Sequence, residues 1–546
     1  MHDLESCSRR LTAFFHSLVW GIAILLAAPC PGKTPSAPPI DREPSAKEAA
    51  RPAAETTQPA KPSEPPLWQR VDDAPLPAVD TGEPFALPQA EGFQGIWYSN
   101  QPSGDEYVYK YSGGLGTYPQ QLNPIAIYVP EVDKTFFVFG GRASKANRLL
   151  HMISYYDHQT GLVARPRILL DKQTDDAHDN PTLVIDSQGY LWVFSNAHGT
   201  SRPAFVHRSE KPYAINSFIK IAETNFSYSQ PWFVPQKGFC FLHTHYEQGR
   251  RFLFVWRSDD GITWSNRRLL AAMEQGQYQI SWPAPWGVGT AFNFHPKSGG
   301  LNARTNLYYL ETRDGGDTWQ TASGATVELP LLDPHNPALV HDYAAEGRLV
   351  YLKDINYDAD GRPVILYLTS NGYRSGPESG PRIWHTAAFD GTHWVIHDVT
   401  TSDHNYDYGP LYIEPDGTWR IIAPTDDGPQ VYNTGGEIVM WISRDRGCTW
   451  HKIRRLTAQS VFNHTYVRRP LNAHDDFYAL WADGHARRQS ESRLFFTNRE
   501  GDTVFMLPPV MTGDFARPIP VWRGVEIAPS APCNKKESAA EEAVTR

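Results

Sequence analysis

The sequence predicts an all-β protein of the β-propeller class, and three observations carry this prediction. A short turn motif occurs three times, aromatic residues are abundant, and short apolar or alternating runs recur between turn signals. The 546 residues include 26 Tyr, 25 Phe and 17 Trp beside 41 Gly and 45 Pro, which suits short strands joined by tight turns. Long amphipathic helical patterns are hard to find, so the prediction is all-β.

The turn motif occupies residues 258–264, 312–319 and 443–450, where it reads Ser-Asp-Asp-Gly-Ile-Thr-Trp, Thr-Arg-Asp-Gly-Gly-Asp-Thr-Trp and Ser-Arg-Asp-Arg-Gly-Cys-Thr-Trp. Each copy offers an Asp carboxylate for backbone N–H groups, a Gly where φ can be positive, and a Trp that can plug a hydrophobic gap. We therefore expect each copy to lock a hairpin. Because this role is structural, function must be argued from other residues.

The spacing of these turns predicts a radial repeat. Asp259 and Asp314 are 55 residues apart (314 − 259), and so are Asp445 and Asp390 of a weaker turn (445 − 390). A unit of this length fits a four-stranded blade with long loops, and about seven units would fill the body of the chain. Six or eight blades stay open, and a pair of β-sandwiches is the alternative, although it gives no reason for a recurring hairpin lock.

The amino terminus resembles an export signal. Arg9 and Arg10 precede an apolar run over residues 18–28, which is too short to span a bilayer comfortably but fits a signal-peptide core. Residues 1–31 are therefore predicted to be a signal peptide, and the protein to be secreted or periplasmic, with an uncleaved anchor left open. Lipoprotein anchoring at Cys30 is the less favoured alternative, because a Pro precedes this residue.

Composition divides the remainder of the chain into three parts. Residues 32–88 are rich in Pro, Ala, Ser, Glu and Lys, which predicts a disordered spacer, and residues 521–546 form a polar tail of the same kind. Residues 89–520 are left as the propeller, which we expect to be catalytic. The net charge of −9 argues against broad nucleic-acid binding, and no partner protein is evident.

Two histidines are the first candidates for chemistry. His178 and His198 flank a predicted hairpin, so both side chains could rise to the same end of one blade. Two imidazoles at one rim can divide acid and base roles near neutral pH. Taken singly, each histidine is more often a surface or hydrogen-bonding residue, so it is the pair that indicates a site.

A second polar cluster covers residues 242–251, which read Leu-His-Thr-His-Tyr-Glu-Gln-Gly-Arg-Arg. Strand alternation places His243 and His245 on one face, where they could contact substrate or a metal, although no third metal ligand is identified. Arg250 and Arg251 offer bidentate donors for a carboxylate or sulfate, with a solvated turn as the alternative. Further candidates for substrate contact on other predicted blades are Asn180, His295, Arg304 and His404.

With the repeated turns, the run Asn-Ala-Arg-Thr-Asn-Leu-Tyr-Tyr at 302–309 and two histidines 20 residues apart (198 − 178), the chain resembles the BNR-4 group of Asp-box β-propellers. Within that group it is similar to ulvan lyases and to related propeller rhamnosidases. The resemblance implies β-elimination of a uronate-containing, sulfated polysaccharide of the ulvan kind, without a redox cofactor, and it allows a structural Ca or Zn ion. Two His, a Tyr and an Arg carry that chemistry, and they match His178, His198, Tyr228 or Tyr246, and Arg250 or Arg251.

Other functions compete with this hypothesis. A propeller glycoside hydrolase of the rhamnosidase kind would use a similar scaffold, and a non-catalytic glycan-binding BNR-repeat protein would explain the aromatic residues equally well. A sialidase is expected to carry an Arg-Ile-Pro motif, and the nearest string here is Pro-Arg-Ile-Trp at 381–384. The polysaccharide, endo or exo action and the oligomeric state are left open by the sequence.

Overall fold

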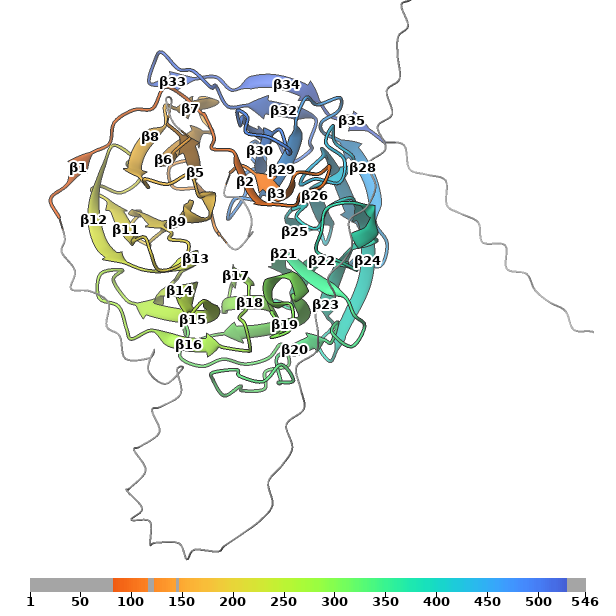
Figure 1. The fold of residues 1–546 in the computed structure, drawn as a ribbon. Coiled ribbons are helices and arrows are strands. Elements are labelled where there is room, and N and C mark those ends of the chain that lie inside the picture. The colour runs from red at the N-terminus through yellow and green to blue at the C-terminus, as the bar shows by residue number, and fades with distance from the viewer. Residues whose placement is uncertain (1–81, 116–121, 144–146, 528–546) are drawn as a thin grey trace, which may run out of the picture. The chain divides into compact units, whose positions relative to one another are not determined.

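A computed structural model describes residues 82–115, 122–143 and 147–527, which form a ring of seven antiparallel β-sheets (Figure 1). The prediction of an all-β, seven-bladed propeller is therefore confirmed. The predicted leader, nearly all of the predicted spacer and most of the predicted tail lie outside the described residues. In the described part of the chain, no helix has the length and apolarity needed to cross a bilayer.

The first four blades are built from strands that follow one another in sequence, with the first strand of each blade nearest the axis (Figure 1). Blade 1 comprises β4 (Ala126–Val129), β5 (Lys134–Arg142), β6 (Leu149–Asp157), β7 (Leu162–Ala164) and β8 (Arg167–Asp171). Blade 2 comprises β9 (Pro181–Ile185), β10 (Leu191–Ser195), β11 (Ala204–Ser209) and β12 (Ser217–Thr224). Blade 3 comprises β13 (Ser227–Val234), β14 (Gly238–Glu247), β15 (Arg250–Ser258) and β16 (Arg268–Ala271). Blade 4 comprises β17 (Gln279–Ala284), β18 (Gly287–Phe294), β19 (Thr305–Thr312) and β20 (Leu339–His341).

The other three blades follow the same plan, and short 3-10 helices lie in three of the connections. Blade 5 comprises β21 (Leu349–Tyr357), β22 (Pro363–Ser370), β23 (Arg382–Phe389) and β24 (Trp394–Ser402). Blade 6 comprises β25 (Leu411–Ile413), β26 (Trp419–Asp426), β27 (Glu437–Ser443) and β28 (His451–Arg455). Blade 7 comprises β29 (Asn463–Arg468), β30 (Ala479–Gly484), β31 (Leu494–Thr497) and β32 (Thr503–Met506). The 3-10 helices are η2 (Ala177–Asp179), η3 (Gly300–Ala303) and η4 (Pro377–Ser379).

The core lies between neighbouring blades, which is why many strands are apolar on both faces. All five residues of β10 are buried, because blade 2 packs against a blade on either side. Between blades 2 and 3 the ring of Phe194 lies 4.7 Å from Phe241, which in turn lies 5.9 Å from Trp256. Burying one such ring removes roughly 150–250 Å² from water, an upper bound of about 4–6 kcal/mol of stabilisation.

The three repeated turns join the third and fourth strands of blades 3, 4 and 6, and they act as the expected hairpin locks. Asp260 accepts the backbone N–H of Thr263 at 2.7 Å, and Asp314 and Asp445 each accept an equivalent bond at 2.9 Å. The equivalent residue in the first copy is therefore Asp260 and not Asp259, and the spacing to Asp314 is 54 residues (314 − 260). The radial repeat predicted from this spacing is unaffected.

The ring closes where blade 7 meets blade 1. The backbone N–H of Tyr128 donates to the carbonyl of Leu471 at 2.9 Å, and the N–H of Leu471 donates to the carbonyl of Ala126 at 2.8 Å. The loop between β29 and β30 is thereby joined to β4, the innermost strand of blade 1.

Short segments at both ends of the described chain pair with the outer edges of four blades. β1 (Phe85–Ala86) pairs with β12, so the propeller begins before residue 89 and β34 and β35 continue it past residue 520. These segments pair through their backbone and leave most side chains exposed, so no hydrophobic pattern marks them in the sequence. The carboxyl-terminal strands are β33 (Phe515–Ala516) on blade 1, β34 (Ile519–Arg523) on blade 7 and β35 (Val525–Glu526) on blade 6.

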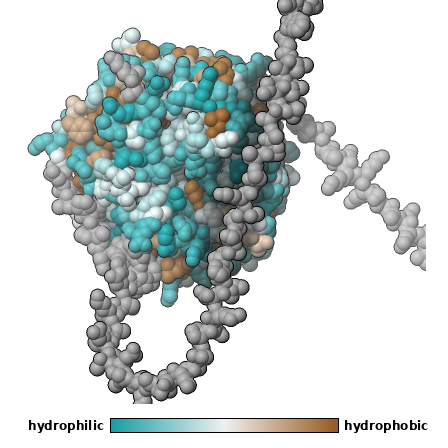
Figure 2. Space-filling view, viewed as in Figure 1, coloured by the Kyte–Doolittle hydropathy of each residue, from teal (hydrophilic) through white to brown (hydrophobic). Residues whose placement is uncertain are grey.

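One hairpin belongs to no blade. It consists of β2 (Tyr98–Pro102) and β3 (Tyr109–Gly113), and it lies near the centre of the ring in Figure 1. The side chains of Ser375 in blade 5 and Asn433 in blade 6 donate to its backbone carbonyls at 3.2 and 2.9 Å. The hairpin therefore crosses one mouth of the propeller. The molecular face in Figure 2 is mostly hydrophilic, with apolar side chains in small separate patches.

Candidate active site

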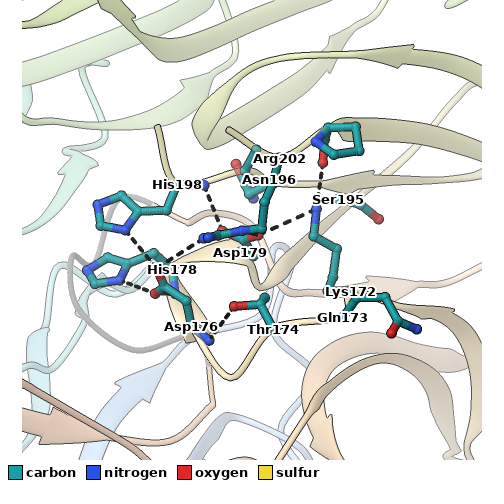
Figure 3. A network of polar contacts seen from close by, with 12 residues as sticks. Lys172, Gln173, Thr174, Asp176, His178, Asp179, Ser195, Asn196, His198 and Arg202 are labelled. Carbon is teal, nitrogen blue, oxygen red and sulfur yellow. Dashed lines mark hydrogen bonds and ion pairs between the residues drawn. The ribbon is translucent and has the colours of Figure 1, made fainter. Parts of the chain in front are cut away.

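The two predicted histidines meet beside one carboxylate. His178 lies in η2, immediately before β9, and His198 follows β10 in the same blade. One carboxylate oxygen of Asp176 accepts a bond from Nδ1 of His178 at 2.6 Å, and the other accepts a bond from Nδ1 of His198 at 2.8 Å (Figure 3). The two rings stack with centroids 4.1 Å apart, so Asp176 holds both imidazoles in register.

Asp176 is itself fixed by its neighbours. It caps η2 by accepting the backbone N–H of His178 at 3.1 Å, and Arg202 donates to it at 3.1 Å. Arg202 also binds Asp179 at 2.8 Å, and Asp179 in turn accepts the backbone N–H of His198 at 2.6 Å (Figure 3). These bonds therefore hold the loop before β9 and the loop after β10 in fixed positions relative to each other.

Electrostatics fix the protonation of this group. Burial alone would raise the pKa of Asp176, but the two imidazoles outweigh it and hold that pKa well below its usual range. Burial and the neighbouring His198 lower the pKa of His178. Asp176 is therefore ionised at neutral pH and accepts from Nδ1–H of both rings, which leaves Nε2 of each ring for other partners.

Four tyrosines lie beside these rings, and Tyr98 of β2 packs edge-on against His178 with ring centroids 5.4 Å apart. Tyr111, on the hairpin that belongs to no blade, places its hydroxyl 2.8 Å from Nε2 of His178. The ring of Tyr246, at the end of β14, lies 5.9 Å from that of His198 between centroids, and its hydroxyl is 3.1 Å from the hydroxyl of Tyr228. Both predicted tyrosines therefore lie at the site, and the ring of Tyr246 is slightly nearer to that of His198 than the ring of Tyr228 is, at 5.9 against 6.3 Å. Burial raises the pKa of Tyr228 well above its usual value.

Of the two predicted arginines, Arg251 lies at the site and Arg250 does not. Nε of Arg251 donates to the hydroxyl of Tyr246 at 3.1 Å. Arg250 is the next residue on the strand and points the other way, where it donates to the carbonyl of Glu274 at 2.7 Å and stacks on Phe252. Arg250, one of the two arginines expected to be catalytic, therefore points away from the site, and Arg251 is the one that reaches it.

Basic side chains form a wall beside these tyrosines. The guanidinium carbons of Arg251 and Arg304 lie 5.8 and 5.2 Å from the centre of the Tyr278 ring. Lys110, on β3, is 5 % exposed, and its ammonium group donates to the side-chain oxygen of Asn302. Burial, with Arg304 and Arg251 nearby, lowers the pKa of Lys110 to about 7. Among the described residues, the side-chain hydrogen-bond acceptors of Lys110 and Arg251 are the neutral groups of Asn302 and Tyr246, so this wall suits an anionic ligand.

The other residues predicted to contact substrate lie in different surroundings. His295 is fully buried beside Tyr278, with ring centroids 4.8 Å apart, and Asn180 is buried directly after η2. His404 is buried on the blade 5 and 6 side, where it bonds Ser375 at 3.1 Å. These three residues line or support the same mouth of the propeller.

His243 is a correction to the predicted set. It is fully buried, with its ring stacked on Phe254 and tilted against Trp256 at centroid distances of 5.9 and 4.6 Å. Burial lowers its pKa well below the usual value, so it packs as a neutral flat ring in the core. The alternation that placed His243 and His245 on one face does not say that this face is covered by a neighbouring blade.

Sequence reasoning missed several residues that complete the site. Asp176 lies two positions before His178, and this spacing in an Asp-Ala-His string is a signal that could have been used. Tyr111 and Lys110 had no such signal, because the hairpin that carries them is 67 residues before His178 (178 − 111). Asp176, His178 and His198 also offer one ligand atom each within 4.8 Å of one another, so a metal could compete for these groups.

Comparison with known protein families gives a match that covers most of the residues of this site. Residues 151–402 match the BNR repeat-containing family. The match runs from β6 to β24 and includes both histidines, Tyr246 and Arg251, whereas the hairpin with Lys110 lies outside it. The resemblance to BNR propellers inferred from the turn motifs is thereby confirmed.

Individual relatives point in the same direction. An ulvan lyase of Nonlabens ulvanivorans is 23% identical over 331 residues, which cover 52% of this chain and 65% of the relative. The structure of a PL25 ulvan lyase superposes on this chain with a TM-score of 0.59 at 16% identity, over 75% of this chain and 96% of that one. A second structure of that kind, bound to -[GlcA(1-4)Rha3S]-, gives 0.59 at 15% identity over the same shares. The polysaccharide lyase Uly1 gives 0.54 at 10% identity, over 76% and 100%. At these identities the structural likeness shows the fold.

Proposed function

We propose that this protein is a polysaccharide lyase that cleaves a uronate-containing, anionic polysaccharide by β-elimination. The observation that carries the proposal is the placement of the Asp176-bridged histidine pair beside the Tyr246 and Arg251 pair. This site offers a base, a weak acid and fixed positive charge, which are the three things that the elimination needs.

The reaction can be written with these groups. A base removes the proton from C5 of the uronate, the C4–O4 bond breaks, a double bond forms between C4 and C5, and O4 takes up a proton. No electrons leave the system, so the balance calls for no redox partner. Negative charge develops on the uronate carboxylate in the transition state, and stabilising that charge is where preorganised cations act most strongly.

His198 is the base in this proposal. Its Nδ1–H bond to Asp176 leaves Nε2 free to accept the C5 proton, and the imidazolium that forms stays 2.8 Å from a carboxylate. His178 has its Nε2 engaged by Tyr111, so it positions the cluster and does not take the proton. The side chain of His198 is also the more exposed of the two rings, at 29 % against 3 %.

Tyr246 is the acid that protonates O4. Its hydroxyl lies 3.1 Å from both Nε of Arg251 and the hydroxyl of Tyr228, so positive charge and a hydrogen bond stabilise the tyrosinate left behind. Arg251 and Lys110 then face the substrate carboxylate or a sulfate ester. The basic wall favours an ulvan-like substrate, in which both groups occur, and the likeness to ulvan lyases supports that choice.

Localisation follows the predicted leader: we propose that the enzyme acts outside the cytoplasm, where such polymers are encountered.

The test is to incubate the protein with ulvan, a heparin-like polymer and pectate, and to follow both ultraviolet absorbance and new reducing ends. A lyase produces an unsaturated uronate, so absorbance and reducing ends rise together. Reducing ends without absorbance would identify a glycoside hydrolase, and binding without either product would identify a glycan-binding protein. Arg250→Ala is the matched control, because its side chain points away from the site and should leave turnover within about twofold.

A further inference from the structure

A second histidine cluster lies where the propeller closes, at the opposite ends of the strands from the proposed active site. Asp133 lies in the turn between β4 and β5, His158 follows β6, and His474 lies in the loop between β29 and β30. Each offers one ligand atom, and the three atoms lie within 4.8 Å of one another. The rings of His158 and His474 are 3.9 Å apart between centroids. Blades 1 and 7 therefore both contribute to one cluster.

Neighbouring groups orient each of the three side chains. The hydroxyl of Thr135, which is fully buried, lies 2.9 Å from Nε2 of His158. Nδ1 of His158 is buried and has no hydrogen-bond partner among the described residues. The hydroxyl of Tyr128 donates to one oxygen of Asp133 at 3.1 Å and leaves the other oxygen available. A buried, unpartnered imidazole nitrogen beside a carboxylate oxygen indicates that a ligand belongs there.

His474 is oriented from its own loop. Its Nδ1 accepts a bond from the backbone N–H of Asp476 at 3.1 Å and lies 3.8 Å from the carboxylate of that residue. Cation binding at Nε2 requires Nδ1 to carry the ring proton, so the bond from the Asp476 N–H would be exchanged for one to the Asp476 carboxylate.

We propose that Asp133, His158 and His474 bind one Zn²⁺ ion that clasps blade 7 to blade 1. Two imidazole nitrogens and one carboxylate oxygen are a common protein ligand set for Zn²⁺, with water in the fourth position. Ca²⁺ would require six to eight oxygen ligands, and the cluster offers one carboxylate. Thr135, Tyr128 and Asp476 act as the outer groups that fix ligand orientation.

The location explains what the ion would do. The same loop that carries His474 makes the two backbone bonds between Leu471 and β4 that close the ring. Asp133 and His474 are 341 residues apart (474 − 133), so only the closed ring brings them together, and an ion that binds there stabilises the folded state. The ion therefore stabilises the closed ring and takes no part in the proposed elimination, so either proposal can fail without the other.

The experiment is to strip the full chain with a chelator and titrate Zn²⁺ alone by equilibrium dialysis, with thermal unfolding followed in parallel. We expect one Zn²⁺ per chain and a higher unfolding midpoint with Zn²⁺ present. His158→Ala and His474→Gln should each weaken binding by at least ~100-fold and remove the midpoint shift, and Thr135→Val should weaken it by roughly 10-fold. Co²⁺ bound to the unaltered protein should show the strong visible bands of a tetrahedral site.

Two control variants separate this site from other metal binders. His335→Ala removes an exposed histidine of blade 4 and should change nothing. His198→Ala tests the cluster of Asp176, His178 and His198, and it should leave the Zn²⁺ stoichiometry at one. Zn²⁺ binding that is lost in His198→Ala and kept in His474→Gln, the absence of Zn²⁺ binding, or an octahedral Co²⁺ spectrum would overturn the proposal. Because the Co²⁺ spectrum uses the unaltered chain, a variant that fails to fold does not remove the test.

Discussion

The two histidine clusters of this propeller contain the same residue types and differ in their surroundings. At the proposed active site, Asp176 accepts from Nδ1 of both His178 and His198, which leaves Nε2 of His198 for the substrate. Where blade 7 meets blade 1, Tyr128 donates to one oxygen of Asp133 and Thr135 lies beside Nε2 of His158, and Nδ1 of His158 has no hydrogen-bond partner among the described residues. Under the two proposals made above, the outer hydrogen bonds, and not the residue types, distinguish the cluster that transfers a proton from the cluster that binds a metal.

The largest expected effect comes from the carboxylate of Asp176, which bonds both histidines of the proposed active site. Asp176→Asn keeps the shape but cannot hold both Nδ1–H donors, so we expect the elimination rate to fall by roughly 10³–10⁴-fold. Circular dichroism should show an unchanged fold, and Zn²⁺ binding where blade 7 meets blade 1 should be unaffected. A loss of less than tenfold in the ultraviolet assay would show that Asp176 does not control the histidines.

The second largest effect on the rate is expected from Tyr246, the proposed acid. The cluster of Asp133, His158 and His474 has no counterpart of this group. Tyr246→Phe removes the hydroxyl that protonates O4 and should lower the rate by about 10²–10³-fold, with little change in KM. The matched control is Tyr228→Phe, which removes a neighbouring hydroxyl 3.1 Å away and should cost far less. Steady-state kinetics on one uronate polymer distinguishes the two, and equal losses would assign the acid role to the pair.

The arginine comparison sharpens the electrostatic part of the account. Arg251→Ala removes the guanidinium that bonds Tyr246, and we expect the ratio of kcat to KM to fall by roughly 10–100-fold. Arg250→Ala, one residue earlier, removes a side chain that packs on Phe252. Equal losses of activity in the two variants would contradict the proposal that Arg251, and not Arg250, acts at the site.

The smallest effect on rate should come from Lys110, whose change acts on binding and stability in opposite directions. Lys110→Met should raise KM several-fold and raise the free energy of unfolding at pH 6 by about 1–3 kcal/mol, because a buried cation without a carboxylate is removed.

The pH dependence of that stability gain has a defined sign. Burial lowers the pKa of Lys110 from 10.5 to about 7, so above pH 7 the folded chain releases a proton that the unfolded chain keeps until about pH 10. The unfolded state then binds more protons, so wild-type stability from this group rises with pH across that window. The advantage of the variant is therefore largest at pH 6 and shrinks toward pH 10. Urea titrations at several pH values measure it, and an advantage that grew with pH would contradict the placement of Lys110.

Much of the fold could be predicted because its signals are local and repeated. The Asp, Gly and Trp turns lie within eight residues each, and their spacing fits the blades. The same local signal could not choose between Asp259 and Asp260, because two adjacent carboxylates can satisfy the pattern and only the turn geometry separates them. The strands at β1 and β35 escaped prediction because they pair through backbone alone.

The site was predicted in part for the same reason. His178 and His198 flank one hairpin, so the hairpin alone predicts that the two side chains lie close together, as they do. The prediction for His243 was wrong because strand alternation shows which residues share a face but does not show which neighbouring blade covers that face. Tyr111 and Lys110 could not be found because a hairpin outside the blades carries them across the mouth of the propeller.

The most direct measurement of the central claim is the rate of unsaturated uronate formation by His198→Ala on a polymer that the unaltered protein cleaves. If Asp176 and His198 form the base, the absorbance signal falls to background while circular dichroism and the thermal unfolding midpoint stay close to those of the unaltered protein. Turnover that persists at the original rate in a folded His198→Ala variant would contradict the account.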